Sequence, residues 1–534
     1  MLLSDVMHFM PTWLWLILGL LAICGWALSI RYQKGFSKYK GPFLASFTNF
    51  WRIWQRLRYP HRTYFQDVAQ YGRIIRVGPN TLLFNDPEAV KDIYMTHFNK
   101  SSFYSVAQGV SRGHVVANIF STTDRVYHGK LRRTVAHAFA LSTLVQYEPY
   151  VTDTLATLLF QLDQRFGGKP GGEGICDLAD WCRFFALDVI SDMTQGRPYG
   201  LLEAGFDHIG VVEAQFKFLQ YFTVTNNAPW LDRMLKKNPI LLWLGRKGLW
   251  NSVTATVPVA QRQLAELSRD FKNHNGDETT RGRVPLLAKF LQAKVNHGDI
   301  VDDRAVLGLT LSMVNAGSGT VSTTLAAALY FLLKDPPVMK HLITELDEHF
   351  PPTGPDASTP RTQQWLAENI VVPFAEAQKL PFLDAVIKEV FRLWPALGMQ
   401  LMERVTPPEG AHILGEYIPG NTIVSCNSWI LHRHKPTFGE DADKFRPSRW
   451  LLATPDRLQA MNKAMLMFGA GPNTCIGKNI AMLELYKAIP SLLRNFSFQL
   501  VDPNKEWKVA NLGGAEVSEF FVRFEARETT PQTV

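Results

Sequence analysis

The chain has 534 residues, of which 46% are hydrophobic and 19% charged. This composition is typical of a globular protein with a large core, and it excludes an intrinsically disordered chain. The formal net charge of +8 is small for this length and includes no basic run of the kind that binds nucleic acid, so we expect no nucleic-acid partner. The five cysteines are odd in number and form no CxxC pair, which argues against a disulfide framework and indicates a reducing compartment.

The N-terminal segment predicts a membrane anchor. Residues 11–30 form an uncharged, apolar run long enough to cross a bilayer as a helix. The residues before the run include Asp5 but no Lys or Arg. Four basic residues follow it: Arg31, Lys34, Lys38 and Lys40. The positive-inside rule then places the rest of the chain in the cytosol, whereas a cleaved signal peptide would have a basic start and a shorter apolar run. We therefore expect residues 1–40 to be a retained anchor with a basic flank, and residues 41–534 to form one domain.

Helical periodicity dominates after the anchor. Residues 73–84 alternate in polarity around Gly78-Pro79-Asn80 and predict a hairpin. Strand patterns return only near residues 399–427 and 498–525. These patterns predict a mainly α fold with small β-sheets.

Two further helices carry charged pairs at helical spacing. His128 and Arg132 share one face of a predicted helix, a pattern that most often marks a solvated basic surface. Glu389 and Arg392 share a face of the helix that Pro381 opens. The flanking apolar residues indicate that this second face is buried, where an ion pair must be fully hydrogen-bonded to be tolerated.

Residues 306–333 contain no charge over twenty-eight positions. A transmembrane helix is one interpretation, but the centre carries amide, glycine and hydroxyl groups that hydrocarbon tolerates poorly. A helix that is apolar all round can also form the core of a large soluble domain. We expect a buried core helix that begins near Asp302, ends at Asp335 and is about 50 Å long.

The segment 468–477 (FGAGPNTCIG) holds three glycines and Cys475, directly before an apolar, helix-like run. Glycines let a backbone turn tightly around a ligand, and a cysteine at a helix start is favoured as a thiolate. A thiolate among backbone N–H groups can bind iron. A phosphate loop fails on spacing, because Gly471 and Gly477 enclose five residues rather than four and Asn479 stands in place of the hydroxyl. A buried structural cysteine is the remaining alternative.

This segment resembles the haem-binding loop of cytochrome P450 enzymes, Phe-x-x-Gly-x-(Arg or His)-x-Cys-x-Gly, in which Asn473 replaces the usual cation. Residues 316–320 resemble the oxygen-binding motif of that family, although Gly319 stands where an acid is usual. Residues 389–392 and 445–450 are similar to its Glu-x-x-Arg and Phe-x-Pro-x-Arg-(Phe or Trp) motifs. The resemblance covers about residues 40 to 525 and is greatest to membrane-bound fungal monooxygenases of secondary metabolism.

The resemblance implies a cytochrome P450 fold and a role for each motif. Cys475 is the axial ligand of haem b, and Thr320, with Ala316 and Gly317, organises oxygen on the opposite side. Glu389, Arg392 and Arg449 form a structural ion network. The other expected haem contacts are His128, Arg132, Arg404, Phe468, Gly469, Asn473 and Gly477. Expected walls of the substrate pocket are residues 104–120, 315–316, 396–399 and 512–517.

The resemblance also implies a function. It describes a haem-thiolate monooxygenase that inserts an oxygen atom from O2 into an apolar small molecule. Electrons would come from NADPH through a membrane-bound cytochrome P450 reductase, and the single-pass protein would sit in the endoplasmic reticulum membrane with residues 41–534, the haem-thiolate catalytic domain, in the cytosol.

Three alternatives remain open. Gly319 favours an isomerase, a dehydratase or a peroxide-driven enzyme that needs no reductase. A membrane haem-binding protein without catalysis is the second alternative. The third is a non-haem iron enzyme that uses His432 and His434 with Glu440 or Asp441, although the four other motifs would then be coincidence.

Overall fold

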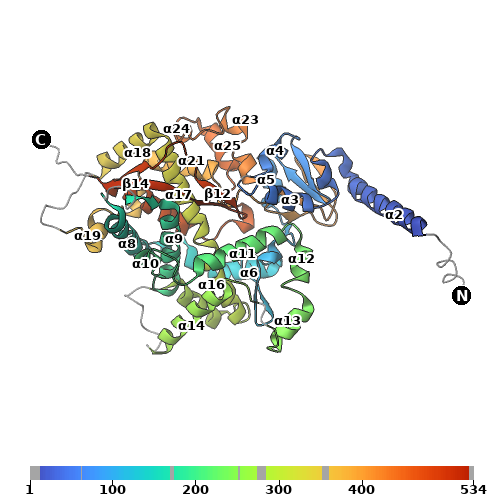
Figure 1. Cartoon of the computed structure of the whole chain (residues 1–534), viewed down its shortest axis with the longest axis horizontal. Helices are drawn as coiled ribbons and strands as arrows, with labels where there is room; N and C mark the ends of the chain where they lie inside the picture. Colours follow the sequence, from blue (N-terminus) through green and yellow to red (C-terminus); the bar gives the residue numbers. More distant parts are fainter. Residues whose placement is uncertain are drawn as a thin grey trace.

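The computed structural model describes residues 12–61, 63–168, 174–250, 253–273, 284–350 and 360–527. Helix α2 (Thr12–Tyr32) projects away from the rest of the molecule (Figure 1) and is followed by the 3-10 turns η1 (Gln33–Lys38) and η2 (Phe43–Ser46). The base of α2 is attached to the body, because Arg76 donates a hydrogen bond to the carbonyl of Ile30 at 2.9 Å and Arg31 donates to Ser46 Oγ at 2.9 Å. Residues 1–11 of the predicted anchor lie outside the described residues.

The sheet next to α2 joins distant parts of the chain. Its strand order is β1-β2-β10-β7-β3, in which β10 is parallel to β2 and the other pairs are antiparallel. The strands are β1 (Ile74–Gly78), β2 (Thr81–Phe84), β10 (Ile423–Cys426), β7 (Arg404–Val405) and β3 (Asn99–Lys100). The predicted hairpin over residues 73–84 is confirmed as β1 and β2.

The remaining strands form small sheets. The second sheet has the order β11-β14-β6, and three two-stranded ladders pair β12 with β13, β4 with β5 and β8 with β9. Their bounds are β4 (Gly109–Ser111), β5 (His114–Val116), β6 (Cys176–Asp177), β8 (Ala411–Ile413), β9 (Glu416–Ile418), β11 (Phe496–Leu500), β12 (Lys508–Asn511), β13 (Ala515–Ser518) and β14 (Phe521–Ala526). The strands β3 to β6 were not expected from the sequence, because two or three residues are too few to show an alternating pattern.

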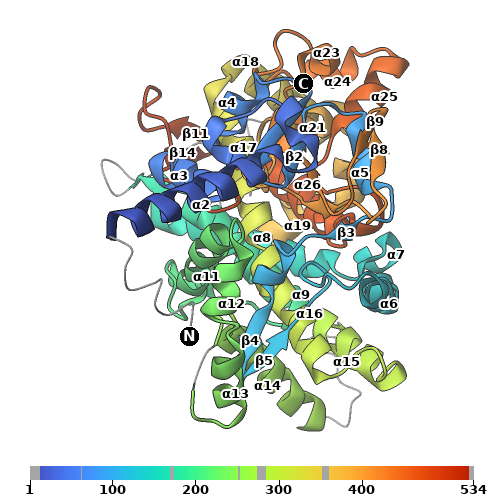
Figure 2. The same cartoon turned by 90° about the vertical axis from the view of Figure 1, so that its right-hand side faces the viewer.

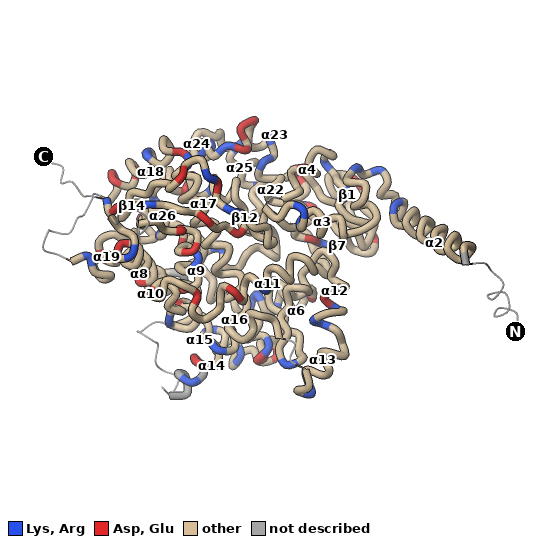
Figure 3. The backbone as a smooth tube through the Cα atoms, in the orientation of Figure 1, with Lys and Arg blue, Asp and Glu red and all other residues tan. Residues whose placement is uncertain are grey.

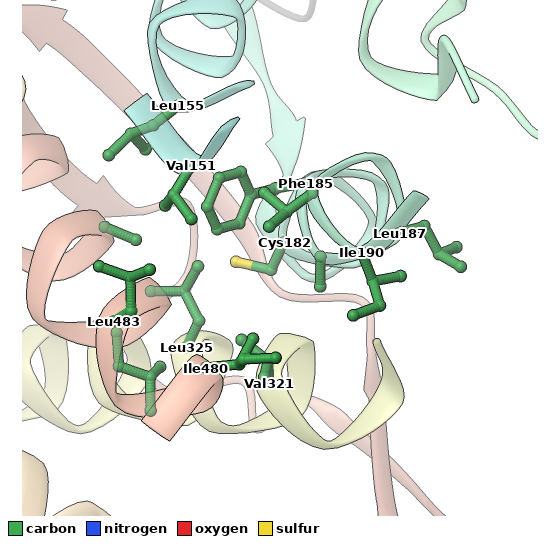
Figure 4. Close-up of a cluster of buried hydrophobic side chains, with 14 of the residues drawn as sticks. Val151, Leu155, Cys182, Phe185, Leu187, Ile190, Val321, Leu325, Ile480 and Leu483 are labelled. Carbon is green, nitrogen blue, oxygen red and sulfur yellow. The ribbon is translucent and has the colours of Figure 1, made fainter. Parts of the chain in front are cut away.

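Four long helices build the core. Side chains of α8 (Glu148–Phe166), α9 (Leu178–Gln195), α17 (Gly319–Lys334) and α26 (Lys478–Asn495) meet in one cluster, shown in Figure 4. Val321 of α17 and Ile480 of α26 belong to this cluster and are both nearly inaccessible to solvent. The packing therefore places the start of α17 near the start of α26, although the two are far apart in sequence.

The central uncharged segment is buried, as expected, but it is not one continuous helix. It consists of α16 (Asp303–Ala316) and α17, which run through the middle of the molecule (Figure 2) and are separated by Gly317 and Ser318. Two helical segments of the described residues are long and apolar enough to span a membrane: Trp13–Lys38, whose most apolar window is 0% buried, and Asp303–Lys334, whose window is 67% buried. Burial supports a core role for the second.

The break between α16 and α17 has a local cause. Ser318 Oγ donates to the carbonyl of Val314, and Gln215 Nε2 donates to the same carbonyl. Thr320 Oγ1 donates to the carbonyl of Ala316 at 3.0 Å. Side chains that bond these carbonyls compete with the helical N–H donors and bend a helix. The expected core helix therefore has the predicted bounds, with an interruption at Gly317 and Ser318.

The other helices surround these core elements. Those before the central segment are α3 (Phe50–Arg58), α4 (Phe65–Ala69), α5 (Ala89–Tyr94), α6 (Arg125–Val135), α7 (Leu141–Leu144), α10 (Leu201–Ala204), α11 (Val211–Thr225), α12 (Pro229–Met234), α13 (Pro239–Arg246), α14 (Val257–Asn273) and α15 (Leu286–Asn296). Those after it are α18 (Pro336–His349), α19 (Gln363–Asn369), α20 (Phe374–Ala377), α21 (Pro381–Leu393), α22 (Ser428–Leu431), α23 (Lys435–Phe438), α24 (Ser448–Leu451) and α25 (Pro455–Ala464). The predicted class, mainly α with small sheets, is confirmed.

Candidate active site

The glycine-rich loop lies between α25 and α26 and closes on itself. The N–H of Cys475 donates to the carbonyl of Phe468 at 2.7 Å, and a 3-10 turn η7 (Gly471–Asn473) lies between them. Gly469 and Gly471 have φ angles of +69° and +63°, a conformation that side chains disfavour. At Gly471 a Cβ would also overlap the carbonyl oxygen of Tyr94. Two glycines of the loop are therefore required by its shape.

Cys475 differs from the buried cysteines of the domain. Its side chain is exposed, whereas those of Cys176, Cys182 and Cys426 are buried. Partial enclosure by protein raises the pKa of the Cys475 thiol; hydrogen bonds from the N–H groups of Gly477 and Lys478 and the charge of Arg132 act in the opposite direction. Burial outweighs these contacts, so the pKa of the thiol lies above its ordinary value, while the contacts themselves favour the thiolate, the form that binds a metal.

Ala316 forms an opening in the otherwise buried central segment. Its side chain is exposed, while residues 305–311 and 321–330 are buried. Gly317 packs against α9, where a Cβ would lie 2.5 Å from Ile190 Cγ1, so only glycine permits this approach. The exposed Ala316 shortly precedes α17, the exposed Cys475 shortly precedes α26, and these two helices contact each other. The predicted proximal and distal residues are thus on neighbouring elements.

Positive charges gather beside this region from three elements. Burial, followed by the charges of Lys100, Arg132 and Arg404, lowers the pKa of His128 to about 4. Burial, followed by Arg404 and Arg132, lowers the pKa of Lys100 to about 7. Lys100 and Arg404 stand directly opposite each other on β3 and β7, an arrangement that is destabilising for like charges.

The cation cluster fits an anionic group. Within the described ranges, no ion pair to a carboxylate is formed by Lys100, Arg132 or Arg404, and the buried His128 Nε2 has no hydrogen-bond partner. Arg404 donates to Tyr104 at 2.7 Å, and Lys100 donates to the carbonyls of Ile119 and Phe120 at 2.8 Å. Haem carries two propionates, which would supply the missing negative charge, so the donor set fits this cofactor. Sequence reasoning missed Lys100, because only strand pairing reveals its position.

The other predicted cofactor residues belong to the same loop. Phe468 packs edge-on against Phe391, with ring centroids 5.2 Å apart. A Cβ at Gly477 would lie 4.0 Å from Cys475 Sγ, in otherwise open space. Asn473 ends η7 and carries no charge, in keeping with the departure from the family pattern. These placements agree with roles in lining the cofactor, which stay predictions.

The predicted ion network is assembled around one carboxylate. Glu389 accepts five hydrogen bonds of 2.8–2.9 Å. The donors are Arg392 Nε and Nη2, Arg449 Nε, Trp450 Nε1 and the N–H of Arg446. Both guanidinium groups are buried and also donate to carbonyls between residues 432 and 444. The network therefore fastens α21 to the segment that precedes the Cys475 loop.

The histidine pair considered for non-haem iron has other partners. His432 is fully buried; its Nε2 accepts from the N–H of Leu466 at 2.8 Å, and its Nδ1 lies 3.1 Å from the carbonyl of Arg392. Both ring nitrogens are thus occupied, and no lone pair is left for a metal ion. His434 Nδ1 bonds Thr437 instead. The non-haem alternative is therefore rejected.

Comparisons with known proteins agree with this geometry. The sequence profile of the family described as Cytochrome P450 matches residues 42–517. The chain is 34% identical over 93% of its length to the cytochrome P450 monooxygenase cicH of Emericella nidulans, of which it covers 95%. It is 32% identical to cfoH of Aspergillus candidus, over 95% of this chain and 92% of the relative, and 32% identical to asR2 of Sarocladium schorii, over 92% of each; both are also named cytochrome P450 monooxygenases. The chain therefore belongs to the cytochrome P450 family and is an enzyme of that family, which confirms the resemblance found in its motifs.

Proposed function

We propose that this enzyme is a haem-thiolate monooxygenase that inserts one oxygen atom from O2 into an apolar small molecule of fungal secondary metabolism. The observation that carries the proposal is the exposed Cys475 in its glycine loop, on elements next to the opening at Ala316 and beside the cation cluster. Haem b would supply the iron, and a thiolate bound to that iron donates the electron density that favours O–O cleavage. The fungal relatives named monooxygenases support the class of reaction.

In this proposal the cofactor is bound by residues from four parts of the chain. Cys475 would bind the haem iron through its thiolate, and Phe468, Gly469, Asn473 and Gly477 would line the cofactor on that side. His128, Arg132, Arg404 and Lys100 would pair with the propionates. Lys100 then provides the positive charge that the family pattern would place at Asn473. Residues 41–534 act as one catalytic domain.

The opposite side provides space and a hydroxyl group. Ala316 and Gly317 are small and leave room above the cofactor. Thr320 Oγ1 already donates its proton to the carbonyl of Ala316, so its oxygen is oriented to accept a hydrogen bond from a water molecule. Thr320 would thereby hold the water that delivers protons to oxygen.

Aromatic side chains favour an apolar substrate. Phe103, Tyr104, Phe218 and Phe222 form a separate apolar cluster between the loop after β3 and helix α11. This cluster adjoins the predicted pocket segment 104–120. These aromatic side chains would bind an apolar molecule, because binding removes apolar surface from water.

Membrane attachment is supported by exposed apolar residues outside the core. Helix α2 has a single charged residue, Arg31, at its base, and Lys34 and Lys38 of η1 follow it (Figure 3). Trp54 on α3 and Ile240 on α13 are 62% and 68% exposed, and Phe50 of α3 contacts Trp230 of α12. We infer that α2 spans the endoplasmic reticulum membrane and that these helices touch its cytosolic surface, where a cytochrome P450 reductase would deliver electrons from NADPH.

The first test is spectroscopic. Purified, reduced protein should bind carbon monoxide with the red-shifted Soret band of thiolate-bound haem, and Cys475→His should abolish that band. A matched Cys426→Ser variant, which alters a buried cysteine, should keep it. Survival of the band in Cys475→His would show that another residue is the ligand.

The second test addresses the reaction. Comparison of metabolites with and without the gene should reveal an accumulating precursor, and microsomes with reductase should convert that precursor only with NADPH and O2. Conversion without NADPH would favour the isomerase, dehydratase or peroxide-driven alternative that Gly319 suggests. Absence of any turnover would favour the non-catalytic haem protein.

A further inference from the structure

The structure brings a carboxylate to the position where the oxygen-binding motif lacks one. At Gly319, a Cβ built on the glycine would lie 3.5 Å from Glu516 Oε1, which is the one atom within 4 Å among the described residues apart from the two chain neighbours and the backbone of the same helix. A glutamate side chain has three bonds between Cβ and its carboxylate oxygens, a reach of about 3.6 Å. Glu516 Oε1 therefore lies at the distance at which an acid at position 319 would present its own oxygen.

Glu516 is held there by β13, far from Gly319 in sequence. It pairs with Ala510 across the β12–β13 hairpin, and this hairpin contacts both α17 and α9. A Cβ at Gly514 would lie 3.9 Å from the same Oε1. Two glycines thus leave space around this oxygen. The Glu516 side chain is only 12% exposed.

Arg183 forms only a long ion pair with Glu516 and bonds other partners more closely. Arg183 of α9 lies 3.8 Å from Glu516 Oε2, beyond hydrogen-bond distance, and already bonds Asp180 at 2.7 Å and the carbonyl of Val517 at 3.1 Å. Helix α17 has no charge between residues 319 and 333, and Lys508 of β12 pairs with Glu519.

Burial also changes the protonation of this group. It raises the pKa of the Glu516 carboxyl, and the charge of Arg183 opposes the rise only in part. A buried acid that is weakly compensated costs stability, and such groups cluster at functional sites. Glu516 can therefore hold a proton at a pH where an exposed glutamate has lost it.

We propose that Glu516 replaces the acid missing at Gly319 and delivers protons toward Thr320. The inference rests on the proposed monooxygenase reaction, in which the release of one atom of O2 as water consumes two protons and two electrons from NADPH. In each delivery the Glu516 O–H bond breaks, the proton moves through hydrogen-bonded water toward Thr320, and the carboxylate regains a proton from solvent. The carboxyl is unchanged after the cycle.

The principal variant is Glu516→Gln, which keeps the shape and removes the proton donor. Hydrogen peroxide released per NADPH should rise severalfold, product per NADPH should fall to a similar degree, and the solvent deuterium isotope effect on product formation should increase. Glu525→Gln, which removes an exposed acid from neighbouring β14, should behave like the wild type. A Glu516→Gln enzyme with unchanged coupling and isotope effect would overturn the inference.

A second variant moves the acid to residue 319 and tests whether the place of the carboxylate, rather than damage to the fold, accounts for the effect of Glu516→Gln. Gly319→Glu in the Glu516→Gln background should restore most of the coupling, because the carboxylate returns to the same space. Failure of this rescue in protein with full haem content would refute the assigned position.

A measurement independent of turnover is the infrared carboxyl band of the haem-loaded protein. The band of the protonated Glu516 carboxyl is the one that disappears in Glu516→Gln. In the wild type this band should persist to a higher pH than the bands of exposed glutamates. A Glu516 that is already ionised at the pH where exposed glutamates ionise would contradict proton donation. Failure of the proposed function is recognised separately, since wild-type protein would then form product without NADPH or show no thiolate band with carbon monoxide.

Discussion

Neutralising Glu389 is expected to prevent the assembly of the haem site rather than slow the reaction. The carboxylate accepts five hydrogen bonds, three of them from the guanidinium groups of Arg392 and Arg449, and all three side chains are buried. Glu389→Ala leaves the buried Arg392 without a carboxylate, and it leaves Arg449 with Asp441 alone, at 3.2 Å. Breaking a buried network in this way costs about 3–5 kcal/mol.

This cost is large relative to the stability of a domain, which is about 5–15 kcal/mol. Because the network fastens α21 to residues 432–450, we expect the loss to loosen the segment that leads into the Cys475 loop. Arg449→Ala should have a comparable effect, since Arg449 bonds Glu389 and also the carbonyls of Asp441 and Lys444.

The assay is haem content per polypeptide, with thermal unfolding of the purified protein. Glu389→Ala should yield little haem-loaded protein and a lowered unfolding temperature. The control is Glu440→Gln, which breaks the ion pair between Glu440 and Lys435. The Glu440 side chain is 88% exposed, and exposed ion pairs contribute about 0–1 kcal/mol. Recovery of folded, haem-replete but inactive Glu389→Ala protein would refute the structural role and indicate a catalytic one.

Three other predictions concern single side chains. Asn473→Arg should retain haem at least as well as the wild type, whereas Lys100→Met should retain it less well; a clear loss of haem in Asn473→Arg would show a site built around a neutral residue. Thr320→Ala should raise peroxide release per NADPH, and unchanged product per NADPH would exclude its relay role. Glu484 is fully buried, and neither carboxylate oxygen has a hydrogen-bond partner among the described residues. Burial raises its pKa well above the usual value, so ionisation favours the unfolded chain and stability falls as pH rises above about 4.5. Glu484→Met should therefore stabilise the protein by about 1–3 kcal/mol near neutral pH and by less near pH 4, as measured by denaturant unfolding; an equal gain at both pH values would contradict the titration.

The sequence alone determined the features that depend on local chemistry. The glycines around Cys475 predicted a tight loop before a helix, which the structure contains, and the role of Cys475 as a metal ligand stays a prediction. The uncharged runs at residues 11–30 and 306–333 predicted an exposed apolar helix and a buried one, and the structure contains both. The polar centre of the second run was the signal that separated them.

Only the tertiary structure decided which distant residues meet. Lys100 faces Arg404 because β3 pairs with β7, and Glu516 reaches Gly319 because a hairpin packs on α17. Neither residue stands out locally, since a single lysine or glutamate in a short strand has no periodicity to interpret. The break at Gly317 and Ser318 likewise involves Gln215 of another helix, which donates to the carbonyl of Val314. Residues far apart in the chain become neighbours through packing and strand register, and local sequence patterns do not contain that information.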